Sequence, residues 1–530
     1  MFGSTPAGVL AAVAAARYGG AAVTLLDPSP RVGGMCSGGL GVTDEGDPFA
    51  IGGLAREFFL RNARYYNASA GAPLYRLEPH VAELLFLRML AEANVTRVRV
   101  AAVAGVRLSG ARVASLDLED GSSVPTPGVV VDASYEAQVV MGAARALPGV
   151  AFATFGREAA SVYDEPWGGR REPFGSPFDS RAISPLDGSG ALLPLVTTRL
   201  SAPLGAGDAR VLGYNFRRCA VRRGANPRGA PLPDPPPGSY DAAQWELLRR
   251  VAALPGMDGS VDQYVGCGEV PNGKLDCNNG ALVSTDATGL SWAFPAANAS
   301  QRAALVAAHR AYTVAFFYPL RTDPAIPPAV RASAQALGLC GDEFVDNGNW
   351  PEQLYVREAA RLVGDRVLAQ GDLWPATDFG EASIGMGSYA ADGHYSTRGP
   401  CVLQPAGAAH HCVMVTSEAE LQAAAANGTL GTGGEGYVGD VNTFALYQIP
   451  AWALFPKRAA ATNLLSPTAP SASHVAFASL RVEPQYMVMG HAAGVIAAMA
   501  AHAGGAVQDV PLPQLPARLA APGAVLCHEK

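Results

Sequence analysis

The sequence predicts an α/β fold in which a mostly parallel sheet lies between two layers of helices, and three observations lead to this prediction. The first is a glycine-rich turn near the start of the chain, Gly3-Ser4-Thr5-Pro6-Ala7-Gly8. The second is an alanine-rich helix over residues 8–17, followed by a short apolar strand over residues 22–26 that ends at Asp27. The third is a buried strand over residues 129–131 that ends at Asp132.

The turn and its helix have the features of a Rossmann-like dinucleotide-binding unit. Glycine lets the backbone approach a pyrophosphate, the helix N-terminus offers free N–H groups, and an acid about 20 residues later binds ribose hydroxyls. Asp27 follows Gly8 by nineteen residues. Thr5 takes the place of the middle glycine of the usual G-x-G-x-x-G, so the turn alone also fits an ordinary strand–turn–helix.

A second glycine-rich segment follows Asp27 directly. Residues 31–41 read Arg-Val-Gly-Gly-Met-Cys-Ser-Gly-Gly-Leu-Gly and have no helical or strand period. We therefore expect this backbone to lie close to a flat group. At the other end of the chain, residues 471–476 and 480–494 lead into a helix rich in small residues.

Together these segments resemble the FAD-dependent oxidoreductase family of the glutathione-reductase-like, two-dinucleotide-binding-domain flavoprotein superfamily. The resemblance covers nearly the whole chain. In that superfamily, a strand acid followed by a Gly-Gly pair is typical of FAD enzymes, whose loop passes along the ribityl chain and the isoalloxazine. Further family motifs occur in order: Glu78-Pro79-His80-Val81-Ala82-Glu83, Asn278-Asn279-Gly280, Ser284-Thr285-Asp286, Asp342-Glu343-Phe344, Trp350-Pro351-Glu352-Gln353-Leu354-Tyr355-Val356-Arg357-Glu358 and Gly385-Met386-Gly387-Ser388-Tyr389.

The resemblance implies FAD as the cofactor and indicates the residues that contact it. They are Gly3, Ser4, Pro6, Ala7, Gly8, Asp27, Pro28, Arg31, Gly33, Gly34, Met35, Ser37, Gly38, Asp132, Ala133, Glu483, Pro484 and Met487. Only Met1 and Phe2 precede the turn. We therefore expect the natural chain to begin earlier, with an apolar strand and, in one version of this hypothesis, a signal peptide. Without that strand we expect the flavin affinity to suffer.

Two domains are expected from the length and from the order of the motifs. Residues 1–164 and 460–530 would form a discontinuous FAD-binding domain with a truncated first strand. Residues 165–459 would form an inserted α+β substrate domain with helices over 240–253, 299–317 and 328–337. Glycine and proline are frequent over residues 165–237, which we interpret as a surface excursion.

One segment of the substrate half imitates a nucleotide-binding motif. Residues 431–436, Gly-Thr-Gly-Gly-Glu-Gly, fit G-x-G-x-x-G letter for letter. No strand is predicted before them and no amphipathic helix after them, although the motif requires both. We therefore interpret them as a flexible loop.

The expected chemistry is hydride transfer from a substrate C–H to flavin N5, with a base that accepts the departing proton. His474 lies just before the C-terminal helix and is the first candidate for this base. His394 is the second, because it shares a polar loop with Arg398, which could bind a substrate carboxylate or hydroxyl. The alternative for each histidine is a buried side chain that is hydrogen-bonded to backbone.

The leading hypothesis is an FAD-dependent oxidoreductase that acts on a small polar substrate, such as the CH–OH of a sugar or a hydroxy acid. Reoxidation would use oxygen or a carrier. Trp350, Tyr355, Tyr389, Arg398 and the histidines could form the walls of a polar pocket. One alternative is a catalytically silent flavin- or sugar-binding protein, and another is a truncated gene product that cannot hold FAD.

Charge and hydropathy argue against some partners. The formal net charge is −7 and the two signs are interspersed, which provides no basic face for a nucleic acid. The most apolar stretches, residues 8–16 and 492–501, are shorter than the ~20 residues of a membrane span, so no transmembrane segment is predicted. His410-His411-Cys412 lacks metal-ligand spacing, and no metal site is predicted.

The cysteines and the asparagines bear on the compartment. Cys267 with Cys277 and Cys401 with Cys412 could each close a short loop, with free buried thiols as the alternative. Cys36 is interpreted as a packing residue, with a covalent flavin link as the alternative. Glycosylation sequons begin at Asn67, Asn94, Asn298 and Asn427, and they favour a secretory origin.

Overall fold

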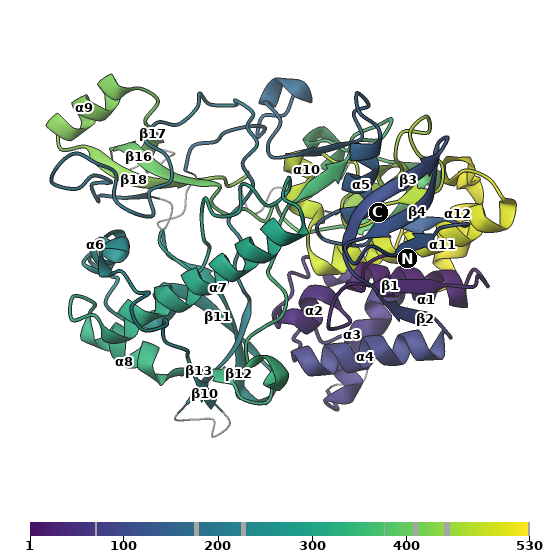
Figure 1. Ribbon diagram of the computed structural model, residues 1–530, viewed down its shortest axis with the longest axis horizontal. Helices are drawn as coiled ribbons and strands as arrows, with labels where there is room; N and C mark the ends of the chain where they lie inside the picture. Colours follow the sequence, from purple (N-terminus) through teal and green to yellow (C-terminus); the bar gives the residue numbers. More distant parts are fainter. Residues whose placement is uncertain are drawn as a thin grey trace.

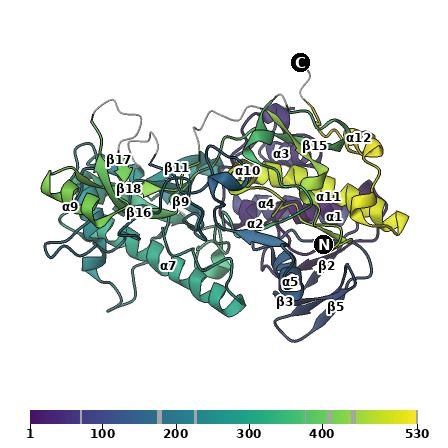
Figure 2. The ribbon, with the colours of Figure 1, turned by 90° about the horizontal axis from the view of Figure 1, so that it is seen from above.

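The computed structural model shows two lobes side by side (Figure 1), and a view from above separates the same lobes (Figure 2). It describes residues 1–68, 71–173, 180–223, 229–375, 377–405, 412–438 and 446–527. The lobe on the right of Figure 1 contains both ends of the chain and carries helices α1–α5 and α11. The lobe on the left carries α6–α9. The predicted mixed α/β fold is confirmed.

A parallel sheet forms the centre of the first lobe. β1 (Thr24–Asp27) pairs with β2 (Thr96–Arg99), and β6 (Val130–Val131) pairs with β20 (Leu464–Leu465), both in parallel. Phe2 lies between β1 and β6 and forms parallel bridges to Leu26 and Asp132. Its N–H donates to Val131 O at 2.8 Å, and Gly3 N–H donates to Leu26 O at 2.9 Å. The glycine turn therefore leaves the middle of a parallel sheet, as a Rossmann-like unit requires.

Two apolar helices cover one face of this sheet. α1 (Pro6–Arg17) packs along α11 (Glu483–Ala503), and α3 (Gly53–Tyr65) and α4 (Pro79–Glu92) pack against this helix pair. A Cβ at Gly490 or Gly494 would collide with the backbone of Ala7 or Ala11, so the two helices are in contact at these glycines. α11 has 21 residues and is the one described helix long and apolar enough to cross a membrane, contrary to the shorter stretch seen in the sequence. Most of its residues are buried within this fold.

The first lobe contains further short strands and helices. β3 (Val103–Ser109), β4 (Arg112–Leu118) and β5 (Ser123–Pro125) form an antiparallel sheet beside α5 (Gln138–Ala146), and α2 (Gly34–Gly38) lies in the second glycine-rich segment. β7 (Ala153–Phe155) pairs with β14 (Ala360–Leu362), and β15 (Ser383–Gly387) pairs with β19 (Tyr447–Pro450). β15 packs on α11, α10 (His474–Leu480) leads toward that helix, and α12 (Leu515–Ala520) follows it. β14 and β15 lie in the first lobe, although both fall within residues 165–459, the range expected for the inserted domain. The division of the chain at residues 165 and 459 therefore stays a proposal.

The second lobe contains two antiparallel sheets. The larger sheet has the order β10 (Gly229–Pro231), β13 (Leu337–Cys340), β9 (Arg218–Arg222), β12 (Lys274–Gly280) and β11 (Val265–Val270). The smaller sheet has the order β17 (Cys412–Met414), β16 (Thr397–Leu403), β18 (Leu430–Glu435) and β8 (Ser180–Arg181). The helices are α6 (Glu246–Ala252), α7 (Ala299–Thr322), α8 (Pro328–Ala336) and α9 (Glu418–Ala426). Figure 1 shows α7 running the length of this lobe.

Two interpretations of glycine-rich sequence are wrong. Residues 431–436 were expected to be a flexible loop, but residues 431–435 belong to β18, which pairs with both β16 and β8. Their glycines allow large neighbours to lie on the strand, since a Cβ at Gly434 would collide with the ring of Tyr395. The range 165–237 is not a surface excursion throughout, because β9 is the central strand of the larger sheet and four of its five residues are buried.

Three disulfides join strands of the second lobe. Cys267–Cys277 links β11 to β12, and Cys401–Cys412 links β16 to β17, so the disulfide alternative holds for both local pairs. Cys219–Cys340 links β9 to β13 across 121 residues and was not foreseen, because no local spacing signals such a pair. Cys36 is a buried free thiol, and Cys527 is an exposed one.

Candidate functional site

The glycine turn and the second glycine-rich segment meet in the structure. Gly3 has a φ of +90°, and a Cβ there would collide with the backbone of Ala133 and Ser134. Gly33 N–H donates to Ser4 O at 2.7 Å, which joins the two segments. Thr5 caps α1, since its Oγ1 accepts from Gly8 N–H at 3.2 Å. The turn, the N-terminus of α1 and the Gly33-Gly34 pair thus form one cradle of closely approaching backbone.

The two strand acids lie at the edge of this cradle, and both are buried. Asp27 accepts from the Ser4 hydroxyl and from Arg97 Nε, each at 2.7 Å. Asp132 accepts from Val139 N–H at 2.8 Å and Val140 N–H at 2.9 Å, and therefore fixes the start of α5. Of the remaining predicted FAD contacts, Pro28 and Arg31 are half-buried, and the others are buried: Pro6, Ala7, Gly8, Met35, Ser37, Gly38, Ala133, Pro484 and Met487.

The start of α11 closes the cradle from the other side. Tyr135 is the link, because its hydroxyl donates to Glu483 Oε1 at 2.6 Å and accepts from Met35 N–H at 3.0 Å. Burial raises the pKa of Glu483 to about 8. Sequence reasoning did not identify Tyr135 as a site residue, although it directly follows the Asp132 strand.

Several buried polar atoms beside this cradle have no partner among the described residues, which tests whether the site suits FAD. They are His474 Nε2, Arg481 Nε and Nη1, Glu483 Oε2 and Gln485 Oε1. Buried polar atoms in proteins are nearly always paired, so these groups call for a partner with hydrogen-bond donors and acceptors. The flavin ring and the ribityl chain provide both kinds of group. The residues present therefore fit FAD.

A polar cavity of about 510 Å³ lies next to the cradle. Asp44, which follows the second glycine-rich segment, lies in its wall, and Arg217, another lining residue, has its backbone directly against Gly39. Arg481 Nη2 lies 3.1 Å from Asp392 Oδ2, and Asp392 also lines the cavity. The complete lining is Asp44, Gly46, Arg217, Asn278, Asn279, Arg357, Ser388, Tyr389, Ala390, Ala391, Asp392, Gly393, His394 and Tyr437.

His394 is fixed in the wall of this cavity by two carboxylates. Its Nδ1 lies 2.6 Å from Asp286 Oδ2, and its Nε2 lies 3.3 Å from Asp392 Oδ1. The Asn279 amide nitrogen also lies 3.3 Å from Nδ1. Burial opposes ionisation of Asp286, but Arg357 and His394 lower the pKa of Asp286 to about 2. Both ring nitrogens of His394 are therefore engaged with neighbouring side chains.

Arg357 reaches the cavity from the segment between the two lobes. Its Nη2 donates to Asp286 Oδ1 at 2.9 Å, and its Nε donates to Gly213 O at 2.9 Å. The guanidinium lies 4.3 Å above the centroid of the Tyr355 ring. Nη1 is buried and has no partner among the described residues, so it is available to a ligand in the cavity.

His474 and Arg398 occupy other places. His474 lies outside the lining residues and is oriented by Glu358, whose Oε1 is 2.9 Å from Nδ1. Its unpartnered Nε2 faces the buried region before α11. Arg398 donates to Leu282 O and Leu195 O at 2.9 and 2.7 Å, so it holds backbone together and is not part of the described lining. Of the residues suggested as pocket walls, only Tyr389 and His394 line the cavity.

Sequence reasoning missed five charged residues of this site: Asp44, Arg217, Asp286, Arg357 and Asp392. Three of them lie in segments noted for other reasons, the Asp286 motif, the Arg357 motif and the loop of His394. Asp44 lies three residues beyond Gly41. An acid placed directly after a cofactor-binding loop is a signal that could have identified it.

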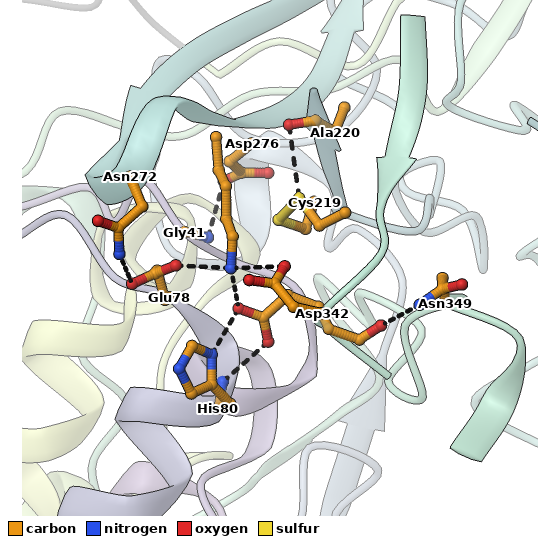
Figure 3. Close-up of a disulfide and its surroundings, with 12 residues drawn as sticks. Gly41, Glu78, His80, Cys219, Ala220, Asn272, Asp276, Asp342 and Asn349 are labelled. Carbon is orange, nitrogen blue, oxygen red and sulfur yellow. Dashed lines mark hydrogen bonds and ion pairs between the residues drawn. A yellow bond between two sulfur atoms is a disulfide. The ribbon is translucent and has the colours of Figure 1, made fainter. Parts of the chain in front are cut away.

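A second cluster of charged residues lies where α4 meets the larger sheet, and Figure 3 shows Glu78, His80 and Asp342 of this cluster near Cys219. Glu78 and Glu343 are buried, whereas His80 is exposed. Glu78, His80 and Glu343 place one ligand atom each within 4.8 Å of one another, as a metal site would. Lys274 Nζ, however, lies 2.6 Å from Glu78 Oε1 and 2.8 Å from Glu343 Oε1. This ammonium takes the position that a cation would occupy. His410 and His411 lie outside the described residues.

Comparison with a family model agrees with the assignment of FAD. A family model described as FAD dependent oxidoreductase matches residues 1–519. No protein of curated function matches the sequence. Among solved structures, Thermovibrio ammonificans THI4 is similar at 21% identity over 28% of this chain and 62% of its own, with a TM-score of 0.22.

Two further solved structures are similar to the chain. The Diels-Alderase PyrE3 of pyrroindomycin biosynthesis is 15% identical over 33% of this chain and 41% of its own, with a TM-score of 0.20. CabE, an aromatic hydroxylase from angucycline biosynthesis, is 16% identical over 40% of this chain and 45% of its own, with a TM-score of 0.22. The chain thus spans less than two thirds of the length of each of these three structures.

Proposed function

Because this chain belongs to the family of FAD-dependent oxidoreductases and has FAD as its cofactor, we propose that it dehydrogenates a small polar substrate bound in the cavity. One observation carries this proposal: a cavity lined mainly by polar side chains adjoins the glycine segment that the family resemblance assigns to the flavin. When bound, FAD supplies a hydride acceptor at N5. The residues of this chain bind the substrate, orient it and accept its proton.

The cavity wall supports a substrate with a CH–OH group, such as a sugar or a hydroxy acid. Its lining contains hydrogen-bond donors, such as Arg357 and Asn279, and acceptors, such as Asp44 and Asp392. A polyhydroxylated molecule can pair with both kinds of group, whereas an apolar molecule would leave them unsatisfied. We propose that Arg357 Nη1 binds a substrate oxygen, because this buried donor has no described protein partner.

We propose that His474 and Arg481 contact the flavin. Support comes from their unpartnered buried nitrogens, which lie just before α11. Glu358 holds the His474 ring through Nδ1, so Nε2 is free to bond to a flavin edge atom. In this arrangement His474 positions the cofactor, and a residue of the cavity accepts the substrate proton.

The test is to purify the protein, identify the released cofactor by mass spectrometry, and record anaerobic spectra with a panel of neutral sugars, α-hydroxy acids and amines. Bleaching of the oxidised flavin by a sugar or hydroxy acid is the expected result. FAD that stays oxidised with every compound would instead indicate a catalytically silent flavin- or sugar-binding protein. Bleaching by amines alone would overturn the proposed substrate class.

A further inference from the structure

We propose that Asp44 is the general base of the reaction and that Tyr389 positions its carboxylate. This inference rests on the proposed function, because it concerns the proton that leaves the substrate hydroxyl. Asp44 lies in the wall of the cavity, directly after the glycine-rich segment, and Tyr389 OH donates to its Oδ1 at 2.9 Å. The described lining contains two carboxylates, Asp44 and Asp392. Asp44 is the one that lies closer in sequence to the flavin-binding segment.

The reaction must release one proton for each hydride. The substrate C–H bond breaks, and its electron pair passes with the hydrogen to oxidised FAD. The O–H proton passes to Asp44, and a carbonyl group forms on the substrate. FAD gains two electrons, which oxygen or a carrier later removes, and Asp44 returns its proton to solvent.

The other charged groups of the described lining, and Tyr389, are unsuited to accept this proton. Both ring nitrogens of His394 lie within 3.3 Å of a carboxylate oxygen, so neither is directed at a substrate hydroxyl. Asp392 bonds to His394 and Arg481; burial raises its pKa, but Arg481 and then His394 lower it by more. Arg217 and Arg357 are guanidinium groups, which stay protonated in proteins. Burial, and after it the charge of Asp44, raises the pKa of Tyr389.

Asp44 itself is free of these constraints. It forms no ion pair with any described residue, and Tyr389 supplies its described side-chain hydrogen bond. The charged and titratable groups that face it are Asp392, Arg217, Tyr389, Arg481 and Tyr355. Burial and then Asp392 raise the pKa of Asp44 to about 6, against the lowering effect of Arg217. A base poised near neutral pH is efficient, because it is deprotonated at rest and still holds the transferred proton.

The backbone before Asp44 is held rigidly. Asp276 Oδ2 accepts from Gly41 N–H at 3.0 Å and from Val42 N–H at 2.9 Å. Arg217 bonds to the same carboxylate and also donates to Val42 O at 3.2 Å. These bonds join the glycine-rich segment to β12, so the Asp44 carboxylate is fixed relative to both the cradle and the cavity.

The experiment compares flavin reduction by the best compound of the panel in the parent protein, D44N, D44A and H474Q, each loaded with FAD. We expect D44N to lower the rate of reduction by about 100-fold or more, the usual contribution of a general base. D44A should regain activity when formate is added, which a merely structural loss would not allow. The acid limb of the pH profile, near 6 in the parent, should disappear in D44N. The neighbouring E45Q is the matched control and should keep the parental rate.

A second measurement needs no substrate. In flavin-free protein, protonation of Asp44 should contribute to the pH dependence of the unfolding free energy between pH 4 and 6. This contribution should be absent in D44N and present in E45Q. D44N that reduces FAD at the parental rate, or H474Q that alone removes the acid limb, would overturn the assignment of Asp44. Parent protein whose FAD no compound reduces would overturn the proposed function, and the assignment with it. The two failures are therefore distinguishable.

Discussion

The α1–α11 interface and the wall of the cavity are both buried, but they are built from opposite kinds of residue. Between the helices, glycine and alanine let two backbones approach, and burial of apolar surface stabilises the contact. Around the cavity, Asp286 and Arg357 are buried as a pair of opposite charges, and the buried His394 ring lies against the same Asp286 carboxylate. The first region is stabilised by close packing and apolar burial, without any charge. The second is stable only while every charge keeps its partner.

The largest effect is expected from a side chain placed in the helix interface. Gly490→Val would force its Cβ into the Ala7 backbone, which cannot move away without displacing α1 and the glycine turn. We expect a loss of about 5 kcal/mol in unfolding free energy, at the upper end for overpacking, together with loss of FAD binding. Urea unfolding and flavin titration measure both. Gly505→Val is the matched control, because nothing lies within 4 Å of that position.

Two buried arginines give the next comparison. Arg357→Met would leave Asp286 without its closest guanidinium partner, and both side chains are fully buried. We expect a loss of about 4 kcal/mol, since the buried Asp286 carboxylate would lose its ion-pair partner and keep only its contact with His394. Arg218→Met should cost nothing or add about 1 kcal/mol. Arg218 is buried over the Phe317 ring without a described ion pair, and burial lowers its pKa to about 9.

The measurement is the urea midpoint of unfolding for the two variants and the parent, recorded side by side. Equal losses in both would contradict the distinction between a paired and an unpaired buried charge. A greater loss in R218M would indicate that the cation–π contact outweighs the desolvation of the guanidinium.

The same contrast explains which parts of the structure could be predicted from the sequence. The helices predicted over 8–17 and 299–317 are found as α1 and α7, and the FAD cradle follows from glycines that are close together in the chain. β18 was missed because a glycine run has no side-chain period. The partners of His394 were missed because Asp286 lies 108 residues away, and spacing does not reveal such a pairing.

Glu483 is an exception to the apolar character of the helix interface, because it is a carboxyl group at the N-terminus of the apolar helix α11. Its pKa is raised from 4.5 to about 8 by burial, so the folded protein keeps the proton over that range while the unfolded chain loses it. The proton on Glu483 therefore stabilises the folded state fully below pH 4.5, and this stabilisation is lost as the pH rises through 8. Glu483→Gln, which mimics the protonated group, should therefore raise the unfolding free energy at pH 7 by about 3 kcal/mol relative to the parent.

This pH effect is measured as the difference between variant and parent from pH 4 to 9 in flavin-free protein. The two curves should converge at low pH. Parallel curves across the whole range would show that Glu483 is ionised in the folded state, and its unpartnered Oε2 would then require another explanation.

The smallest effect concerns the position where the glycine motif departs from its usual form. Thr5 has φ of −61° and ψ of 167°, which requires no glycine, and its hydroxyl both caps Gly8 N–H and donates to Ala133 O at 2.7 Å. Thr5→Gly restores the G-x-G-x-x-G pattern but removes both bonds, so it should lower the unfolding free energy by about 1 kcal/mol without tightening FAD binding. Thr5→Ser keeps the hydroxyl and should match the parent in both measurements. Tighter FAD binding by T5G with unchanged stability would mean that, at this turn, close backbone approach matters more than the cap.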